Sequence, residues 1–521
     1  MTSTYLNQFD AFSKDELFEG LLGWGLFSDK LPPVFSSYQF FEFCFTNAPS
    51  YGHIQHSYAR YQNIKHTGNT RTFGIPTPFT YYELCKEISE SREEFRGLFR
   101  TNTAFDTHKV SRLHLRKMAK TNKLFEMNYE NYKLDGSPRF DLLFQSKYVL
   151  KTDISQCFPT IYTHAIPWAF VGKETAKRDR GQHLFYNRLD RCACNMNYGE
   201  THGLLIGPHA SNLLAETILT SVDKELVRLG CKHIRYIDDY WIFADSEQIA
   251  EEYLIRLDEL LHQFGLNINR GKTSLLRLPL PEGEDWMREL LSYKLPKCPS
   301  KKQADCPGAS TCRFFIDYKE INYFLDYIIR LIEKYESDTR IFKYAIRMIS
   351  GYQLTEAAKS AYVLRLGALC KPFPYLVPLL QEFVFSPFNI APTTIKTIIE
   401  DLYKWAVSYR YYEAASFCLY IALENNILIS NVDCDFGSNS DCVFLVLLYL
   451  YAKKNALQSL VRKHKDYVKT FLGQTDEDKR QFQELWLYTY TVLNANELRG
   501  CDEWTQLKNK KVSFLRPLYL Y

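Results

Sequence analysis

The sequence lacks any apolar run long enough to cross a membrane. Its longest run, residues 443–452, is about half of the roughly 20 residues that a membrane-spanning helix needs. The 14 cysteines follow no regular spacing, and we expect no secretory signal before them, so a disulfide framework is not indicated. We therefore expect a cytoplasmic protein with reduced thiols and no membrane partner.

The sequence also lacks a strong charge bias and an arrangement of Ser or Cys typical of covalent catalysis. The net charge is only +4, so a nucleic-acid enzyme would need its positive charge gathered locally. Aromatic residues, by contrast, are abundant, with 37 Tyr and 36 Phe. Such side chains fill cores and also stack on bases, and filling cores is the more common use.

Two adjacent carboxylates, Asp238 and Asp239, stand in the middle of a strand-like stretch, residues 233–245. The residues on both sides are β-branched or aromatic, which predicts two strands that meet in a hairpin at the aspartates. Adjacent carboxylates repel each other, so a buried pair needs a cation or protons to neutralise it. An acidic hairpin tip in water is the alternative for this stretch taken alone.

A third aspartate, Asp153, closes an earlier predicted strand, and a loop that displays Lys272 follows the hairpin. Asp153 and Asp238 can meet only if their strands are neighbours in one sheet. Hard oxygen ligands select Mg²⁺ over a softer metal. Two such ions about 3.5–4 Å apart would clamp the attacking and leaving oxygens of a phosphoryl transfer. We therefore predict two Mg²⁺ per site, with Lys272 neutralising or protonating the leaving pyrophosphate.

Five segments, in order, resemble motifs of reverse transcriptases. They are residues 71–78 (RTFGIPTP), 153–158 (DISQCF), 203–207 (GLLIG) followed by Ser211, 236–239 (YIDD) and 265–273 (GLNINRGKT). Several motifs in the correct order are far more specific than the YIDD stretch alone. The resemblance implies an RNA-directed or template-independent DNA polymerase that adds dNTPs.

The resemblance also implies roles for residues of these motifs. Asp153 and Asp238 would be the main metal ligands, with Asp239 a weaker third. The backbone carbonyl of Ile154 would help to hold the nucleotide-bound ion. Phe158 would be the ring that clashes with a ribose 2′-OH, which implies dNTP use, and a core phenylalanine is the alternative.

Further residues are placed around the nucleotide in the same way. Arg71, in the fingers motif, and Lys272 would contact the nucleotide, and Tyr236 would touch the primer end. Gly207 and Ser211 would let the backbone approach the template–nucleotide pair.

Downstream of these motifs no thumb, integrase, RNase H or endonuclease segment is recognisable. A series of amphipathic helical patterns follows instead, and this combination resembles bacterial defence-associated reverse transcriptases of the abortive-infection and unknown-group lineages. The resemblance implies a role in antiphage defence. For priming and assembly it implies four options: no conventional template, a protein tyrosine as primer, a non-coding RNA partner, or an oligomer. Leu205 and Ile206 replace the proline-glutamine of many retroviral enzymes, so template handling stays open.

We predict an α+β architecture, with right-hand polymerase fingers and palm built from an antiparallel sheet with helices, followed by an all-α, repeat-like domain. The predicted ranges are 1–64 for an N-terminal helical extension, 65–294 for fingers and palm, 295–314 for a linker and 315–521 for the C-terminal domain. The expected partners are dNTPs, a nucleic acid template, primer or non-coding RNA, and further copies of the chain.

Two tyrosines, Tyr519 and Tyr521, lie in the last stretch of the sequence. A phenol there could present its hydroxyl to the active site as a primer, and an apolar tail docked on the last helices is the alternative. Two other functions stay open, namely a catalytically idle nucleic-acid-binding scaffold and an ordinary retroelement reverse transcriptase. The three intact carboxylates argue against the idle scaffold, because unused buried acids destabilise a fold.

Overall fold

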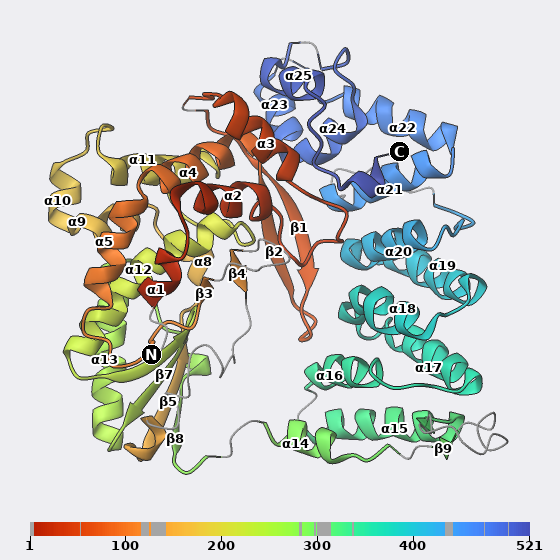
Figure 1. Ribbon diagram of the computed structural model, residues 1–521, viewed down its shortest axis with the longest axis horizontal. Helices are drawn as coiled ribbons and strands as arrows, with labels where there is room; N and C mark the ends of the chain where they lie inside the picture. Colours follow the sequence, from red (N-terminus) through yellow and green to blue (C-terminus); the bar gives the residue numbers. More distant parts are fainter. Residues whose placement is uncertain are drawn as a thin grey trace, which may run out of the picture.

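The protein is described here by a computed structural model. It covers residues 5–52, 54–115, 124–126, 142–280, 284–295, 298–299, 314–335, 338–432, 441–473, 475–498 and 500–520. Figure 1 shows the helices and strands of the first half at the left and centre, and the helices of the second half in an arc at the right. Within the described ranges, no helix has the length and apolar character needed to cross a membrane.

The N-terminal part combines helices with a β-hairpin. Helix α2 begins with a capping box, in which Ser13 and Glu16 each accept a hydrogen bond from the other's backbone N–H. The predicted boundary between residues 64 and 65 falls at the tip of the β1–β2 hairpin, which pairs Tyr58 with Pro76 at its open end. The elements are α1 (Tyr5–Asp10), α2 (Lys14–Trp24), α3 (Tyr38–Asn47), β1 (Tyr58–Ile64), β2 (Thr70–Pro76), α4 (Pro78–Glu90) and α5 (Arg92–Asn102).

A four-stranded antiparallel sheet with the strand order β6–β7–β5–β8 forms the centre of the next part. The strands are β5 (Tyr148–Asp153), β6 (Lys232–Tyr236), β7 (Asp239–Ala244) and β8 (Ser274–Arg277). The predicted hairpin around the two aspartates is confirmed by the pairing of β6 with β7. Two helices, α12 (His209–Arg228) and α13 (Glu247–Gln263), contact strands of this sheet, as their apolar periodicity requires.

Several short elements surround this sheet. They are β3 (His114–Leu115), β4 (Phe125–Glu126), α8 (Cys157–Thr160), α9 (Ala165–Val171), α10 (Lys173–Arg178), α11 (Phe185–Asn195), η1 (Arg270–Lys272) and α14 (Asp285–Ser292). In the predicted linker, the described residues form the small pair β9 (Cys298–Pro299) and β10 (Phe314–Phe315).

Within the described ranges, the elements that follow β10 are helices, apart from isolated β-bridges such as that between Ile316 and Leu354. Two of the helices, α23 and α24, are separated at Leu485, whose φ of −119° leaves the helical region. The elements are α15 (Tyr318–Lys334), α16 (Arg340–Ile349), α17 (Glu356–Leu369), η2 (Pro374–Leu379), η3 (Gln381–Phe385), α18 (Ser386–Phe388), α19 (Pro392–Ser408), α20 (Tyr412–Glu424), α21 (Cys442–Lys454), α22 (Gln458–Lys469), α23 (Asp476–Glu484), α24 (Trp486–Val492), α25 (Asp502–Asn509) and η4 (Pro517–Tyr519).

The C-terminal helices cover the outer edge of β1. The N–H groups of Gln62 and Ile64 point away from β2 and donate hydrogen bonds to the carboxylates of Asp441 (3.2 Å) and Glu413 (2.6 Å). An edge strand would otherwise leave these donors unpaired. Trp486 of α24 adds a hydrogen bond of 3.0 Å from its Nε1 to the carbonyl of Ile75 on β2. Both strands of the hairpin are therefore hydrogen-bonded to the C-terminal helices.

Glu413→Gln is expected to change the pH dependence of stability. Burial raises the pKa of Glu413 from 4.5 to about 7, so the folded chain binds a proton that the unfolded chain has already released. The stability from this proton is complete below pH 4.5 and is lost as the pH rises through about 7. Glutamine does not titrate, so the variant should gain stability relative to the wild type over that interval, by roughly 3 kcal/mol at most.

Thermal unfolding of both proteins between about pH 4 and pH 8 measures this difference. Glu356→Gln is the matched control, because Glu356 lies in an exposed first helical turn. A difference between wild type and Glu413→Gln that stays constant with pH would contradict the role given to burial of Glu413.

Candidate active site

The end of β5 and the β6–β7 hairpin bring the three predicted aspartates together. Asp153, the last residue of β5, lies opposite Asp239, the first residue of β7. The N–H of Ile154 donates a hydrogen bond of 3.0 Å to the carbonyl of Asp238. Asp153 ends β5 and Asp238 lies in the turn just before its neighbour β7, as predicted, whereas the metal-binding roles of Asp153, Ile154, Asp238 and Asp239 stay predictions.

The carboxylates crowd one another at this end of the sheet. Burial raises the pKa of Asp238, and the nearby charge of Asp153 raises it further. Partial burial, followed by the charges of Asp238 and Asp153, raises the pKa of Asp239 to about 6. A positive charge placed here would therefore stabilise the ionised aspartates.

Lys272 supplies one such charge. The short helix η1 carries it, and its Nζ lies 2.5 Å from Oδ2 of Asp153. The other oxygen of Asp153, Oδ1, is buried and has no hydrogen-bond partner among the residues that the structure describes. Because an unpaired buried acceptor is unfavourable, this oxygen favours the approach of a further cation or hydrogen-bond donor.

Two further cations approach the aspartates from the β1–β2 hairpin, Arg71 on β2 and Lys65 at its tip. Burial lowers the pKa of Lys65, and the nearby charges of Arg71 and Lys272 lower it further. The charge of Asp238 acts in the opposite direction on Lys65, and Arg71 and Lys272 in turn lower the pKa of Asp238. These three cations therefore gather around the aspartates.

Sequence analysis did not identify Lys65, although a signal was present. Residues 67–68 are Thr-Gly between two segments rich in aromatic and β-branched residues, a pattern typical of a hairpin turn. Gly68 has a φ of 79°, a conformation that favours glycine, and the N–H of Lys65 donates to the carbonyl of Asn69 across the turn. Interpretation of this stretch as a hairpin would have placed Lys65 at its tip.

The carboxylates of Asp153, Asp238 and Asp239 are the candidate ligands for a divalent cation. Within the described ranges, no three groups from His, Cys, Asp and Glu lie close enough to form a ready-made metal site. The aspartates nevertheless offer hard oxygen donors, one of which is buried without a partner, and their mutual repulsion calls for positive charge. They therefore fit a cation that would replace the ammonium of Lys272 beside Asp153. The identity of this cation as Mg²⁺ and the count of two stay predictions.

The predicted glycine turn, residues 203–207, packs between β2 and α8. Gly207 has a φ of 124°, and a Cβ at this position would meet the ring of Phe73 at 3.2 Å. The N–H of Gly74 donates a hydrogen bond of 2.9 Å to the carbonyl of Ile206, and the N–H of Leu204 donates one of 2.8 Å to the carbonyl of Phe158. The turn thus joins the hairpin to the segment that follows Asp153.

The other predicted nucleotide-site residues differ in their accessibility. Phe158 and Tyr236 are half-buried, and the Tyr236 ring meets Trp241 edge-on with the ring centroids 5.9 Å apart. Ser211 is fully buried, and its hydroxyl has no hydrogen-bond partner. The Ser211 side chain therefore faces the interior, which is consistent only with a role for its small size and not with direct contact to a nucleotide.

The proposed priming tyrosines are not presented at this site. Tyr519 is buried, and its hydroxyl donates to the carboxylate of Glu424 on α20. Its short helix η4 docks with the C-terminal helices, away from the sheet that carries the aspartates (Figure 1). In this structure the tail is docked and the Tyr519 phenol is not free, and a priming role for Tyr519 stays a prediction. Tyr521 lies outside the described residues.

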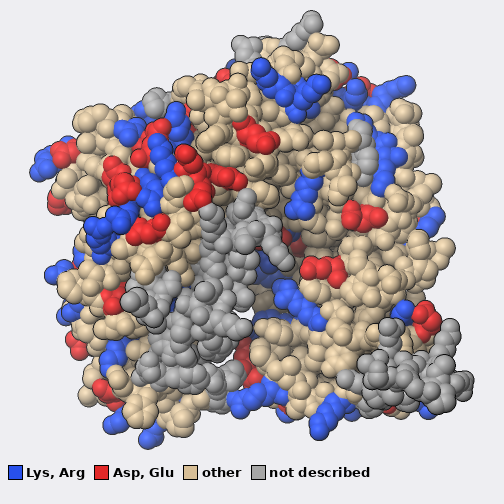
Figure 2. Space-filling model, viewed as in Figure 1, with Lys and Arg blue, Asp and Glu red and all other residues tan. Residues whose placement is uncertain are grey.

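A second group of basic side chains lies where α16 faces the N-terminal part. Burial, together with the nearby charges of Lys30 and Arg347, lowers the pKa of Lys343 to about 8. The hydroxyl of Thr339 donates a hydrogen bond to the carbonyl of His66, which joins α16 to the tip of the hairpin. Figure 2 shows the molecule hollowed at its centre, with Lys and Arg side chains exposed around the hollow. Positive charge is thus gathered locally despite the small net charge.

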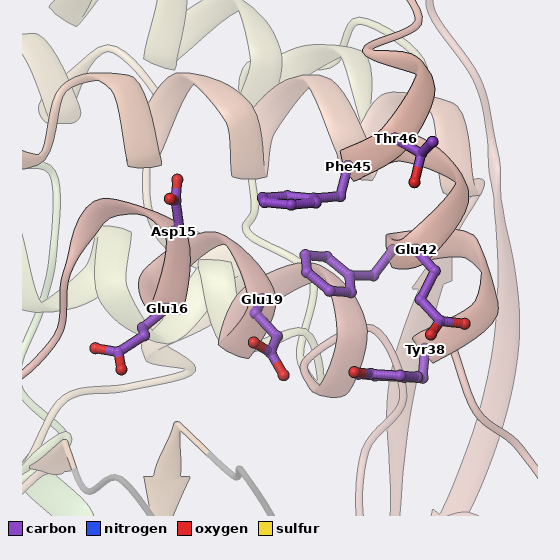
Figure 3. Close-up of a pocket in the computed structure, with 8 residues that line it drawn as sticks. Asp15, Glu16, Glu19, Tyr38, Glu42, Phe45 and Thr46 are labelled. Atoms are coloured by element: carbon purple, nitrogen blue, oxygen red, sulfur yellow. The ribbon is translucent and has the colours of Figure 1, made fainter.

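A pocket of about 380 Å³ lies elsewhere, between α2 and α3 (Figure 3). Acidic side chains gather in this part of the view in Figure 2, and aromatic rings complete the lining. Its lining residues are Asp15, Glu16, Glu19, Tyr38, Phe41, Glu42, Phe45 and Thr46. None of the three aspartates of the sheet lines it, and its negative charge is unsuited to a triphosphate.

Residues 101–314 match the family model described as reverse transcriptase (RNA-dependent DNA polymerase), a range that includes the three aspartates and Lys272 but not Arg71. No curated protein matches the chain. A solved structure of apo telomerase from Candida tropicalis aligns with 85% of this chain and 69% of that chain, at 11% identity and a TM-score of 0.30. That likeness is too weak to support a conclusion about fold or function.

Binding of Mn²⁺, a spectroscopic substitute for a hard divalent cation, is expected to strengthen as the pH rises from about 5 to about 7. The reason is that Asp239, with its pKa raised to about 6, must lose its proton to bind a cation. Lys272→Ala should tighten Mn²⁺ binding at about pH 8, roughly three- to tenfold, because the ammonium no longer competes for Asp153.

Titration calorimetry or electron paramagnetic resonance measures both effects. Arg270→Ala is the matched control, because Arg270 stands in the same short helix but pairs with Asp258 at 3.1 Å. Equal Mn²⁺ affinity for the wild type and Lys272→Ala, or binding that does not change between about pH 5 and pH 8, would contradict the site.

Proposed function

We propose that this chain, whose residues 101–314 match the family model described as reverse transcriptase (RNA-dependent DNA polymerase), is a nucleotidyltransferase that joins dNTPs at Asp153, Asp238 and Asp239. The observation that carries this proposal is the opposition of Asp153 and Asp239 on paired antiparallel strands, next to Asp238. Residues 85 positions apart in the sequence thus offer hard oxygen donors to one place, surrounded by cations from two other elements.

The residues of the site suit a phosphoryl transfer. The attacking 3′-oxygen of a primer forms a bond to the α-phosphorus of a dNTP, and the bond to the leaving pyrophosphate breaks. Divalent ions, when bound, would lower the pKa of the primer hydroxyl and offset charge on the triphosphate. The aspartates would hold those ions, and Lys65 and Arg71 would bind the triphosphate from the hairpin. The ammonium of Lys272 carries a proton that the leaving pyrophosphate can accept.

Nucleic acid is the partner that the distribution of charge favours. Basic side chains gather on the hairpin, at Lys65 and Arg71, and on α16, at Lys343 and Arg347. Figure 2 shows a hollow near the centre of the view with Lys and Arg side chains exposed beside it. Like charges disfavour one another within each group, and the phosphates of a bound strand would offset that repulsion. We propose that a template or primer strand, or a non-coding RNA, occupies this hollow.

We further propose a role in antiphage defence in the bacterial cytoplasm, with the chain acting as a homo-oligomer. The support is the resemblance of the motifs and of the helical C-terminal region to defence-associated reverse transcriptases. Priming by a protein tyrosine is one option among several, and Tyr519 would have to leave its contact with Glu424 to serve. Expression of the chain in a phage-sensitive host, scored by plaque counts with the wild type and an aspartate variant, tests the defence role.

One observation favours a second candidate function. The ammonium of Lys272 already occupies one oxygen of Asp153, and no ready-made three-ligand metal site exists within the described ranges. A catalytically idle scaffold that binds nucleic acid would tolerate this arrangement. The two functions differ in whether biological activity depends on nucleotide incorporation.

Asp238→Asn is expected to lower dNTP incorporation on the order of 10³-fold or more, because several kcal/mol of transition-state stabilisation depend on the metal ligands. The melting temperature should stay equal or rise, because burial already makes the charge of Asp238 unfavourable. Incorporation of labelled dNTPs by purified protein, together with thermal unfolding, provides the measurement.

Asp245→Asn is the matched control, because Asp245 is exposed just after the far end of β7. Undiminished incorporation by Asp238→Asn would contradict the polymerase site. If the variant instead lost incorporation but kept its biological effect, the idle scaffold would be the better account.

Phe158→Val is expected to relax the choice of sugar. The ring would reject a ribose 2′-OH by a clash, and a smaller side chain removes that clash. The ratio of kcat/KM for dNTP over the matching rNTP should fall on the order of 10²-fold. Phe144→Val, at a phenylalanine that is 93% exposed, is the control and should leave the ratio unchanged. Equal discrimination by Phe158→Val and the wild type would show that Phe158 is a packing residue.

A further inference from the structure

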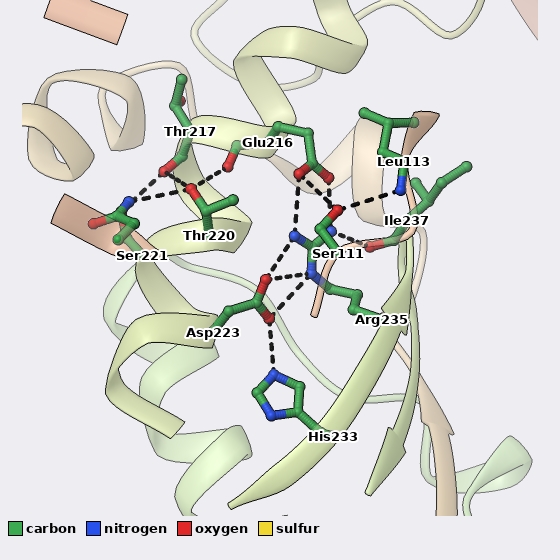
Figure 4. Close-up of polar contacts among 11 residues, drawn as sticks. Ser111, Leu113, Glu216, Thr217, Thr220, Ser221, Asp223, His233, Arg235 and Ile237 are labelled. Carbon is green, nitrogen blue, oxygen red and sulfur yellow. Dashed lines mark hydrogen bonds and ion pairs between the residues drawn. The ribbon is translucent and has the colours of Figure 1, made fainter. Parts of the chain in front are cut away.

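A fully buried arginine lies directly behind the turn that carries Asp238. Arg235 is on β6, and its side chain is 0% exposed, which is rare for a residue of this charge. Figure 4 shows its guanidinium between two acidic side chains of α12 and the backbone of the turn. The arginine therefore connects a helix to the hairpin that displays the aspartates.

All five N–H groups of this guanidinium have acceptors. Nε donates to Asp223 at 2.9 Å, Nη2 donates to Asp223 at 2.7 Å and to Glu216 at 3.2 Å, and Nη1 donates to Glu216 at 2.7 Å. Glu216 and Asp223 are seven residues apart, which places them two turns apart on one face of α12. Both acids are buried and are themselves held, Glu216 by the hydroxyl of Ser111 and Asp223 by His233.

The last N–H of Arg235 reaches the turn itself. Nη1 donates a hydrogen bond of 2.9 Å to the carbonyl of Ile237, the residue before Asp238. Ile237 has a φ of 60°, a left-handed conformation that costs about 1–2 kcal/mol for a residue with a Cβ and is unusual for a β-branched one. Such a conformation persists only where its surroundings hold it.

Asp238 is thus anchored from both sides. The peptide before it is held by Arg235 through the carbonyl of Ile237, and its own carbonyl accepts the hydrogen bond from Ile154 of the neighbouring segment. With both flanking peptides held, the Cα–Cβ direction of Asp238 is set relative to Asp153. Helix α12 begins directly after the glycine turn of residues 203–207, so one rigid element joins that turn to the anchor.

We infer that Arg235 is a positioning residue: its guanidinium, held by Glu216 and Asp223, fixes the left-handed Ile237 peptide and so the place of the Asp238 carboxylate. This inference rests on the proposed polymerase function. A buried ion pair that only joins α12 to β6 would account for the contacts to the acids but not for the bond to the turn. A positioning role and a purely structural role of Arg235 predict different effects on kcat when Ile237 is substituted.

Arg235→Lys is the first test. Lysine keeps the buried positive charge but lacks the planar fork that reaches both acids and the carbonyl of Ile237. We expect kcat for dNTP incorporation to fall on the order of 10²-fold, as for a displaced catalytic group, with KM changed less than threefold because Lys65 and Arg71 are untouched. Mn²⁺ affinity, measured without any reaction, should fall roughly tenfold.

Asn102→Ala is the control for general damage to α12. Asn102 is buried and donates hydrogen bonds of 3.1 Å to Thr220 and Ser221 on that helix, but it touches neither Arg235 nor the turn. The variant should lower the melting temperature while leaving kcat and Mn²⁺ affinity within threefold of the wild type. A loss of kcat in Asn102→Ala equal to that in Arg235→Lys would overturn the inference.

The decisive variant is Ile237→Gly in the Arg235→Lys background. Glycine adopts positive φ without a Cβ clash, so the turn no longer depends on the arginine to hold it. We expect the double variant to regain roughly tenfold in kcat over Arg235→Lys, a coupling that a double-mutant cycle isolates. Additive losses would overturn the inference. If Arg235→Lys does not fold, Glu216→Gln loosens the guanidinium in place, and the same rescue by Ile237→Gly is expected.

The same measurements separate the positioning role of Arg235 from the proposed polymerase activity. An active wild type whose kcat and Mn²⁺ affinity survive in Arg235→Lys would overturn the positioning role alone. A folded wild type that neither incorporates dNTPs nor binds Mn²⁺ would overturn both. Mn²⁺ binding by an inactive wild type, weakened in Arg235→Lys and restored by Ile237→Gly, would support the positioning role and remove the polymerase.

Discussion

Repulsion among carboxylates at one end of a four-stranded sheet is the constraint on which this structure depends. Strand pairing draws Asp153, Asp238 and Asp239 together, and burial, together with the nearby carboxylates, raises the pKa values of Asp238 and Asp239. Three cations lie near these carboxylates. Lys272 is 2.5 Å from Asp153, and Lys65 and Arg71 are on the hairpin. A site that needs cations to be stable is well suited to bind metal ions and a triphosphate.

The two halves of the chain are joined through that same hairpin. The outer edge of β1 is covered by carboxylates of α20 and of the start of α21, and the tip of the hairpin is bonded to the start of α16. The C-terminal helices therefore set where Lys65 and Arg71 lie relative to the aspartates, although they contribute no aspartate themselves. This dependence gives the helical region a physical role in the site, in addition to any partner that it binds.

The turn that carries Asp238 has a strained backbone at Ile237 and is held by a buried side chain, Arg235. The left-handed Ile237 is unfavourable by itself, and the buried guanidinium of Arg235 supplies the contact that holds it. The arginine is in turn fixed by two acids of α12, the helix that follows the glycine turn. Preorganisation of this kind places charge before substrate arrives, which is how many active sites reduce the cost of reaching the transition state.

Much of this arrangement could be predicted from the sequence, and the limits have physical reasons. The strands around Asp153 and Asp238, the helix after the glycine turn and the C-terminal helices follow from local periodicity, which depends on near neighbours in the chain. The contact between Lys272 and Asp153 and the docking of Tyr519 on Glu424 join residues far apart in sequence, for which periodicity carries no signal. Lys65 was missed because its turn was not interpreted as a hairpin.

The sequence by itself determined that three aspartates and a lysine stand at the ends of predicted strands and loops, in an order that resembles reverse transcriptases. Only the tertiary structure decided that a buried arginine supports the turn, that the C-terminal helices hold the hairpin, and that Lys272 forms an ion pair with Asp153. Hydrogen bonds and ion pairs depend on distances of a few ångströms, and folding, not sequence separation, sets those distances.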